Sequence, residues 1–259
     1  MTDGTSVYAY CVVGGPRAPS LRGAPPGVPG SSTTRLLDVT GDLRLVVADV
    51  PAGAWSEDAI SEGLRDVEWV SERALAHEAT IAHFLDADAL IPMKAFTLFR
   101  SEERARAHVL EREADVRAAM ERVAGCVELG VRLRFDEEAS RRAQVAAAAG
   151  EKPSSGAAFL ARKKGLKESA MRARQDAMDA ARSAAEQIAA HAREMRVLPP
   201  PEGIGATSLL IETACLVESS GREALERAVE AMRVDMSARG VDLEVTGPWA
   251  PYHFIGART

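Results

Sequence analysis

The chain has 259 residues, which is enough for one large domain or two ordinary ones. Its 32 lysines and arginines stand against 38 aspartates and glutamates, and the net charge of −6 argues against a nucleic-acid binder that works by bulk electrostatics. No apolar run approaches the roughly 18 residues of a membrane-spanning helix, and the first residues lack the basic segment of a secretory signal. We therefore expect a soluble, cytoplasmic protein with a substantial hydrophobic core.

The three cysteines, Cys11, Cys126 and Cys215, are widely spaced, and each lies in an apolar, strand-like run. A disulfide framework in a secreted protein uses an even set of cysteines. The pattern instead predicts reduced thiols that are buried as small hydrophobic side chains.

The first half of the chain begins with predicted strands and continues with predicted helices. A β-rich run at residues 7–13 is followed by a Gly- and Pro-rich loop, and residues 36–50 are typical of a hairpin around a Thr-Gly-Asp turn. Ser56 can cap a helical pattern that continues to Leu85, either as one long helix or as two with a break near Val70.

An extended apolar stretch at residues 89–99 follows, in which Pro92 indicates the start or the edge of a strand. Ser101 then caps a helix that is expected to end at Gly125. These elements complete a predicted N-terminal α+β domain of residues 1–125.

Two histidines on the first predicted helix resemble a zinc motif at first sight. Zinc ligation from one helix needs histidines four positions apart, on one face. His77 and His83 are six positions apart, which places them about 240° apart around a helix. We therefore predict no shared metal and interpret both as ordinary helix residues.

The second half predicts the order strand, long helix, strand, helix, strand. Residues 126–135 alternate apolar and polar side chains, as do residues 208–218 and 241–245. A helical pattern with an alanine stripe runs from Phe159 to about Met195, which corresponds to roughly 50 Å of helix. A small sheet cannot cover that length, so part of the helix should project, pair with a partner or break.

This order favours a split β-α-β sandwich, a modified form of the ferredoxin-like fold. We predict an α+β protein of two domains, in which residues 126–259 form a modified ferredoxin-like domain with a long helix. The closing segment at 247–254 is expected to lock the last strand into the C-terminal core. Trp249→Ala would then cost stability before it cost any specific contact.

A basic cluster occupies the start of the long helix and consists of Arg162, Lys163, Lys164 and Lys167. Such a cluster is either an ordinary solvated helix face or a docking patch for an acidic partner surface. Charge reversal at Lys163 and Lys164 separates the two, because loss of partner binding at unchanged thermal stability would indicate docking.

The motifs that would indicate catalysis are missing from the sequence. It contains no G-x-S-x-G elbow, no G-x-G-x-x-G turn and no C-x-x-C pair. Glu128, Glu212 and Glu218 lie on predicted strands, but no spacing pairs them into a general acid and base. We therefore predict a protein that is not an enzyme, with no cofactor and no metal site.

Several segments, taken in order along the chain, resemble the gas vesicle protein GvpL/GvpF family. The first strand at 7–10 is similar to the family's tyrosine-containing strand, and residues 91–99 are similar to its Pro-Leu-Arg-Phe-Gly segment. Residues 126–132 resemble its Glu-Trp-Gly-Val-Lys strand, and residues 156–163 resemble its Gly-x-x-Tyr-Leu-x-x-Lys helix start. Residues 247–254, Gly-Pro-Trp-Ala-Pro-Tyr-His-Phe, closely match its closing Gly-Pro-Trp-Pro-Pro-Tyr-x-Phe.

The motif residues that carry this resemblance are Pro92, Phe96, Glu128, Gly130, Gly247, Pro248, Trp249, Pro251, Tyr252 and Phe254. The chain departs from the family pattern where Leu129, Phe159 and Ala250 replace a tryptophan, a tyrosine and a proline. It departs again where Ala95 and Thr97 loosen the Phe-Gly segment. These motifs do not separate an L-like from an F-like role.

The resemblance implies an accessory or minor structural protein of gas vesicle assembly, located in the cytoplasm with the vesicles. Its implied partners are the small hydrophobic shell protein, whose incorporation it would assist without catalysis, and other gas vesicle accessory proteins. A shell subunit exposes apolar surface before it polymerises, and a soluble partner with an apolar groove or a free sheet edge would shield that surface.

Two other classes of function compete with this interpretation. A ligand-binding or enzymatic protein on a ferredoxin-like scaffold would show a deep pocket with converging polar groups or a perturbed carboxylate. A self-assembling scaffold would use the long alanine-striped helix and would be oligomeric in sedimentation experiments.

Overall fold

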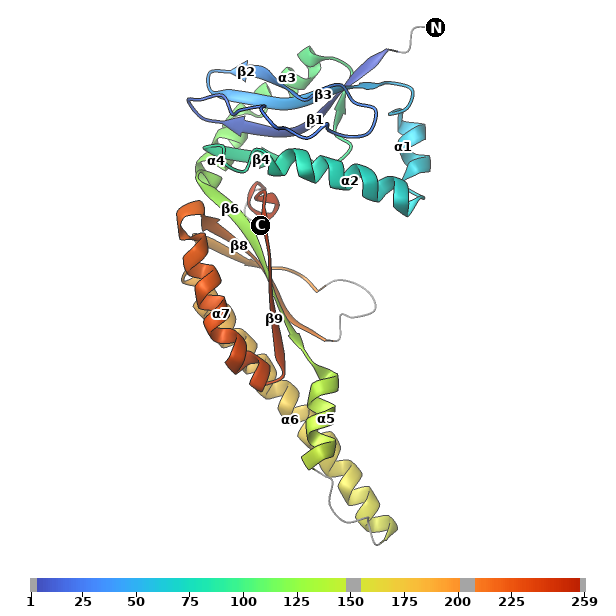
Figure 1. Cartoon of the computed structure of the whole chain (residues 1–259), viewed down its shortest axis with the longest axis vertical. Coiled ribbons are helices and arrows are strands. Elements are labelled where there is room, and N and C mark those ends of the chain that lie inside the picture. The colour runs from blue at the N-terminus through green and yellow to red at the C-terminus, as the bar shows by residue number, and fades with distance from the viewer. Residues whose placement is uncertain (1–3, 148–154, 201–207, 257–259) are drawn as a thin grey trace. The chain divides into compact units, whose positions relative to one another are not determined.

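The computed structural model describes residues 4–147, 155–200 and 208–256 (Figure 1). The chain divides into two compact units. Unit 1 comprises residues 1–128 and 248–259, and unit 2 comprises residues 129–247. Both units contain helices and a sheet, which confirms the predicted α+β class.

Unit 1 is built on an antiparallel sheet in the order β2-β3-β1-β4, with β5 also paired to β1. The strands are β1 (Thr5–Gly14), β2 (Arg35–Thr40), β3 (Leu43–Pro51), β4 (Ala89–Pro92) and β5 (Leu98–Phe99). The predicted hairpin at 36–50 is therefore confirmed as β2 and β3. Strand β1 lies between β3 and the β4–β5 pair, and its residues from Val7 to Val13 are all buried.

A β-bulge in β1 decides which side chains enter the core of unit 1. The pairing with β3 shifts between Ala9 and Cys11, so Tyr10 is the extra residue. The bulge changes the alternation, and Tyr8, Tyr10, Cys11 and Val13 all join one buried cluster. Strict period-two counting would have placed Cys11 and Val13 on the opposite face from the tyrosines.

Unit 1 contains the helices α1 (Glu57–Gly63), α2 (Val67–Ala82), α3 (Glu102–Leu110) and α4 (Glu113–Val123). Polar side chains cap the first three of them. The side chains of Ser56 and Ser101 accept backbone N–H bonds at the predicted positions. The first helical pattern is two helices, and the break lies near Asp66 because that residue caps α2. The pattern predicted to end at Gly125 is likewise two helices, α3 and α4.

Unit 2 carries a four-stranded sheet in the order β7-β8-β6-β9. Its elements are β6 (Cys126–Phe135), α5 (Glu137–Ala147), α6 (Gly156–Ala189), β7 (Glu194–Val197), β8 (Leu209–Glu218), a 3₁₀ turn (Ser219–Gly221), α7 (Arg222–Ala238) and β9 (Val241–Trp249). The first residues of β6 and the last residues of β9 belong to unit 1. The sequence missed α5 and β7. Helix α6 ends at Ala189, and Met195, which was assigned to it, pairs with Cys215 as part of β7.

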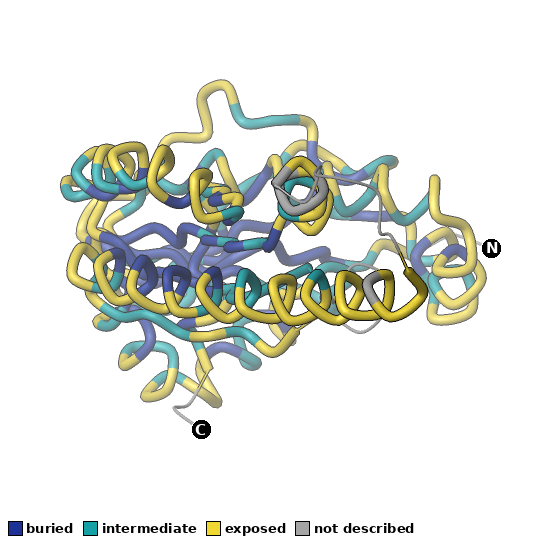
Figure 2. The backbone as a smooth tube through the Cα atoms, turned by 90° about the horizontal axis from the view of Figure 1, so that it is seen from below, coloured by how far each residue is buried: buried dark blue, intermediate teal, exposed yellow. Residues whose placement is uncertain are grey.

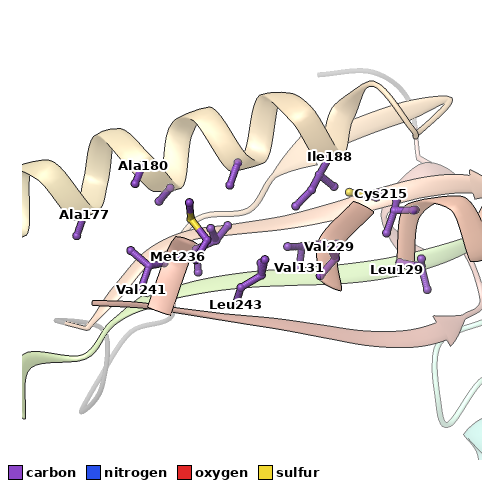
Figure 3. Packing of buried hydrophobic residues seen from close by; sticks show 14 of the residues in the cluster. Leu129, Val131, Ala177, Ala180, Ile188, Cys215, Val229, Met236, Val241 and Leu243 are labelled. Atoms are coloured by element: carbon purple, nitrogen blue, oxygen red, sulfur yellow. The ribbon is translucent and has the colours of Figure 1, made fainter. Parts of the chain in front are cut away.

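Helix α6 packs on the sheet of unit 2 through small side chains. Figure 3 shows Ala177, Ala180 and Ile188 directed from α6 toward the strands, beside Met236 of α7. Alanines on this face let the helix backbone approach the sheet closely, although each buries little area. The alanine stripe is therefore committed to the core of unit 2, so it is not the self-assembly surface that the scaffold alternative required.

The first half of α6 is exposed. Its 34 residues correspond to about 51 Å of helix. Among its residues up to Arg172 whose side chains are described, Leu166 alone is partly covered, while the second half carries the buried alanines. The long helix in Figure 2 shows this change from exposed to buried along its length. The prediction that part of the helix projects is correct.

The closing segment differs from the prediction. Residues 248–256 lie in unit 1, where Ala250 and Tyr252 pack with the cluster that contains Tyr8 and Tyr10. Their assignment to a C-terminal core is therefore wrong, because β9 leaves unit 2 at Gly247. The division into two independently folding domains near Gly125 stays a prediction.

Candidate functional site

The closing motif turns out to be an anchor within unit 1. Ala250 and Pro251 are buried, and a 3₁₀ turn (Tyr252–Phe254) then places the fully buried Phe254 ring in the interior. Trp249, the most conspicuous residue of the motif, is 46% exposed. Phe254, and not Trp249, is therefore the buried aromatic side chain of this segment. The expected effect of Trp249→Ala on stability stays a prediction.

Glu128 binds the closing segment. Its side chain is only 5% exposed, and its Oε2 accepts the backbone N–H of His253 at 2.9 Å. Its Oε1 lies 2.6 Å from Nδ1 of the same histidine, which donates if the carboxylate is ionised. The backbone bond needs no particular side chain at position 253, which agrees with the unspecified position in the family's closing motif. Two motifs 125 positions apart are thus joined directly.

Two further contacts hold the closing segment in unit 1. The Tyr252 hydroxyl donates a short hydrogen bond to Glu78 on α2. Burial, and then this hydrogen bond, raise the pKa of Tyr252 far above its ordinary value, so the group stays a donor. Arg122 donates to the carbonyl oxygens of Phe254 at 3.1 Å and Gly256 at 3.0 Å. We call Glu78, Arg122 and Glu128 the tail anchor.

A buried hydrogen-bond chain connects β1, α2 and the turn between β4 and β5. The Phe96 N–H donates to the Tyr8 hydroxyl at 3.0 Å, and that hydroxyl lies 3.0 Å from His77 Nδ1. His77 Nε2 lies 3.1 Å from the carbonyl of Met93. A carbonyl only accepts, so Nε2 carries the proton and Nδ1 accepts from Tyr8. Burial lowers the pKa of His77, which favours this neutral form.

His77 is therefore a structural hub, and its interpretation as an ordinary helix residue is wrong. Its ring also stacks on Tyr10 with centroids 5.6 Å apart. The Tyr10 hydroxyl in turn accepts the N–H of Val28, which holds part of the Gly- and Pro-rich loop against the core. His83 faces elsewhere, with Nε2 2.9 Å from the carbonyl of Ser20.

Phe96 occupies an unusual backbone conformation, with φ of +66°. Bulky residues rarely adopt positive φ, and here the ring stacks on Trp69 with centroids 5.7 Å apart and planes 7° apart. The guanidinium of Arg73 lies 4.0 Å from the Trp69 ring centre. Aromatic stacking thus offsets the backbone strain.

The remaining motif residues have backbone roles. Pro92 is buried opposite Cys11 as the last residue of β4, so it does not start a strand, but β4 is an edge strand, which agrees with the predicted edge position. A side chain at Gly130 would place Cβ 2.6 Å from Thr246 Oγ1, so β6 and β9 approach too closely for any other residue without adjustment. Gly247 has φ of +112°, a conformation that favours glycine just before Pro248.

The basic cluster lies on the exposed half of α6. Lys163, Lys164 and Lys167 share one side of the helix with two large apolar side chains, Leu160 and Met171. These apolar side chains are 65% and 66% exposed. We call these five residues the lysine face. Arg162 projects from a different side, about 160° around the helix from the centre of this face.

Unit 2 carries a groove of about 860 Å³. It is lined mostly by small side chains, and Asp176, Asp179 and Asp235 are on it. Within residues 4–147, 155–200 and 208–256, no three His, Cys, Asp or Glu side chains are grouped to hold a metal ion. The pKa of Asp42 is lowered, chiefly by the hydrogen bond from Arg117, which keeps this carboxylate ionised and makes it a poor proton donor. Cys11, Cys126 and Cys215 carry reduced, buried thiols, as predicted.

No helix in the described part of the chain has the length and apolar character needed to cross a bilayer. The molecule is thus an α+β protein in which Glu128 and the closing segment meet within unit 1, and whose second unit carries a long helix with an exposed half. The same fold occurs in two solved structures. The GvpF of Anabaena sp. PCC7120 matches with a TM-score of 0.70 at 12% identity, covering 99% of this chain and 98% of that one. The GvpF of Microcystis aeruginosa matches with a TM-score of 0.63 at 13% identity, covering 97% and 99%.

Sequence comparison assigns the family. The model of the gas vesicle synthesis protein GvpL/GvpF family matches residues 6–256. Gas vesicle protein L of Streptomyces sp. (strain CB03234) is 29% identical over 231 residues, which covers 88% of this chain and 85% of that protein. The chain belongs to the GvpL/GvpF family, and the resemblance inferred from its motifs is confirmed.

Sequence reasoning found the motif residues but not their partners. Glu78 and Arg122 lie on helices whose faces look ordinary, and only the tertiary structure shows that they bind the closing segment. Glu128 carried a detectable signal, because a carboxylate within a clean apolar strand requires a partner when it is buried. His77 carried the same kind of signal within an apolar helical pattern.

Proposed function

We propose that this protein is a non-catalytic accessory or minor structural protein of gas vesicle assembly, acting in the cytoplasm and associated with the vesicles. The observation that carries the proposal is the family match over residues 6–256. Its relatives are named gas vesicle protein L and gas vesicle protein GvpF, which supports a role connected with gas vesicles. The proposed partners are the small hydrophobic shell protein and other gas vesicle accessory proteins.

The lysine face is the proposed docking surface for the shell protein. It combines three cations with two exposed apolar side chains, so it can meet a partner segment that is both apolar and acidic. Lys164 lies 3.9 Å from Glu168 on the exposed helix surface, a weak interaction that a partner's carboxylate can replace. Desolvation of Leu160 and Met171 would supply affinity, while the lysines would supply orientation and rate.

We also propose that unit 2 is a modified ferredoxin-like domain. Numbered along the chain, β6, β7, β8 and β9 are strands 1 to 4, and the observed spatial order is 2-3-1-4. The element order is strand, helix, strand, strand, helix, strand, apart from the added α5 and a short 3₁₀ turn. This is the succession expected of a split β-α-β sandwich. Expression of residues 126–247 alone, followed by thermal unfolding, tests whether the unit folds independently.

Two experiments test the functional proposal. Deleting the gene in a vesicle-forming cell should abolish or deform the vesicles, whereas normal buoyancy and vesicle shape would contradict an assembly role. In a pull-down with shell protein, Lys163→Glu combined with Lys164→Glu should reduce capture at unchanged melting temperature. Arg193→Glu is a control, because it changes a charge elsewhere on the unit. Unchanged capture by the lysine variant would return the lysine face to an ordinary solvated surface.

A further inference from the structure

A second exposed face of α6 has a regular charge pattern. Arg162, Gly165, Ser169, Arg172, Asp176, Asp179, Ser183 and Glu186 recur at alternating spacings of three and four, and every one of them is exposed. We call these eight residues the heptad face. Their spacing averages 3.5 residues, the repeat that keeps one face of a helix turned toward a partner helix.

The charges on the heptad face are divided between its two ends. Arginines occupy positions 162 and 172 in the first half, and carboxylates occupy positions 176, 179 and 186 in the second half. The side chains of Arg162, Arg172, Asp176 and Glu186 form no hydrogen bond or ion pair with any residue that the structure describes. By contrast, the neighbouring Asp179 is paired with Arg182 at 3.4 Å.

We infer that the heptad face binds the heptad face of a second copy of this chain, with the two α6 helices antiparallel. A two-fold axis near residue 174 would bring together positions whose numbers add to 348. Arg162 then meets Glu186 and Arg172 meets Asp176, each twice because the axis repeats them. Ser169 meets Asp179 in the same arrangement.

Small residues lie on either side of the central Arg172–Asp176 contacts. Gly165 of one copy faces Ser183 of the other, which permits the two helix axes to approach to about 8 Å. A parallel pair would instead place Arg162 beside Arg162 and Asp176 beside Asp176, and such like-charge contacts are destabilising. The charge pattern therefore selects both the partner and its direction.

The heptad face is separate from the lysine face. The two are about 140° apart around α6, so a dimer leaves Lys163, Lys164 and Lys167 accessible for a different partner. Failure of shell-protein docking and failure of self-association can therefore be measured independently.

Sedimentation velocity of the full chain over a range of concentrations tests the inference. The wild type should form dimers that weaken by tenfold or more between low and high salt, because exposed ion pairs are screened. Arg162→Glu with Arg172→Glu should be monomeric, and so should Asp176→Arg with Glu186→Arg. Mixing these two variants should restore a dimer. Lys163→Glu with Lys164→Glu, which carries the same change of charge, should dimerise like the wild type.

A cysteine pair tests the direction of the helices. Gly165→Cys and Ser183→Cys are made as two separate variants, because an antiparallel pair brings position 165 of one copy to position 183 of the other, whereas a parallel pair brings identical positions together. Mild oxidation of a mixture of the two variants should give a covalent dimer that neither variant gives alone, and circular dichroism should show that both are folded. A wild type that stays monomeric at all concentrations in low salt would overturn the inference. Loss of shell-protein capture by the arginine variants, with a monomeric wild type, would overturn it too and assign the face to the shell protein.

Discussion

The hydrophobic cores of the two units are made of different kinds of side chain. Unit 1 buries large aromatic side chains with polar groups, including Tyr8, Tyr10 and Trp55, and hydrogen-bonds the two hydroxyls. Unit 2 is packed with alanine, valine and leucine, and Phe135 is the one aromatic member of its described core cluster. Hydrogen bonds fix the position of each buried tyrosine in unit 1, whereas the alanines in unit 2 fix the distance between α6 and the sheet.

The largest predicted effect is in unit 1. Phe254→Ala removes a fully buried ring and should reduce the free energy of unfolding by about 3–5 kcal/mol. Trp249→Ala, which removes a half-exposed ring two residues outside the buried Pro251, should cost clearly less. Urea unfolding of both variants measures the difference. An equal or larger loss for Trp249→Ala would show that the exposed tryptophan is the anchor after all.

The stability of unit 2 should be sensitive to side-chain volume added between α6 and the sheet. Ala181 is fully buried between α6 and the sheet, so Ala181→Leu should cost about 1–3 kcal/mol through overpacking. Gln187→Leu adds a comparable side chain on the exposed side of the same helix and should change stability by no more than about 0.5 kcal/mol. Similar melting temperatures for the two variants would contradict close packing of α6.

Variants of the tail anchor test how much polar contacts contribute to the stability of unit 1. Glu128→Ala leaves the backbone N–H of His253 without its acceptor and should lower the free energy of unfolding by about 1–3 kcal/mol. Glu128→Gln keeps an oxygen acceptor and should cost less. Hydrogen exchange at the His253 amide follows the bond directly, and unchanged protection in Glu128→Ala would exclude the anchor.

The smallest predicted effect is a pH dependence from His77. Burial lowers its pKa in the folded state, so over the range below about 6.5 the unfolded chain binds a proton that the folded chain does not. Stability should therefore fall as the pH falls through this range, by at most about 1.4 kcal/mol per pH unit for one group. Comparing wild type with His77→Gln by urea unfolding at pH 7.5 and 5.5 isolates this contribution. An identical pH dependence would assign the effect to other groups.

Periodicity and capping were sufficient to predict much of the fold. The hairpin, the caps at Ser56 and Ser101, the buried cysteines and the projecting half of the long helix follow from local rules. The strand β7 was missed because its four residues continue a helical apolar pattern through Met195. The pattern within this segment gives no information on whether Met195 can pair with Cys215 of another strand.

The candidate site was predictable only as a set of motifs. The closing segment was expected in the C-terminal core because it directly follows the last strand. Its true partners, Glu78, Arg122 and Glu128, lie more than 120 positions earlier in the chain. Spacing rules act within one element, so contacts of this separation are visible only in the tertiary structure.

The return of the closing segment to unit 1 has a consequence for biosynthesis. Residues 129–247 interrupt unit 1 in the chain, so a ribosome makes all of unit 2 before it makes the last piece of unit 1. Although domains usually fold in order from the N-terminus during synthesis, unit 1 cannot be completed until residues 248–256 have been made and can bind the tail anchor. A nascent chain halted just after Gly247 should therefore contain a complete second unit and an unfinished first one.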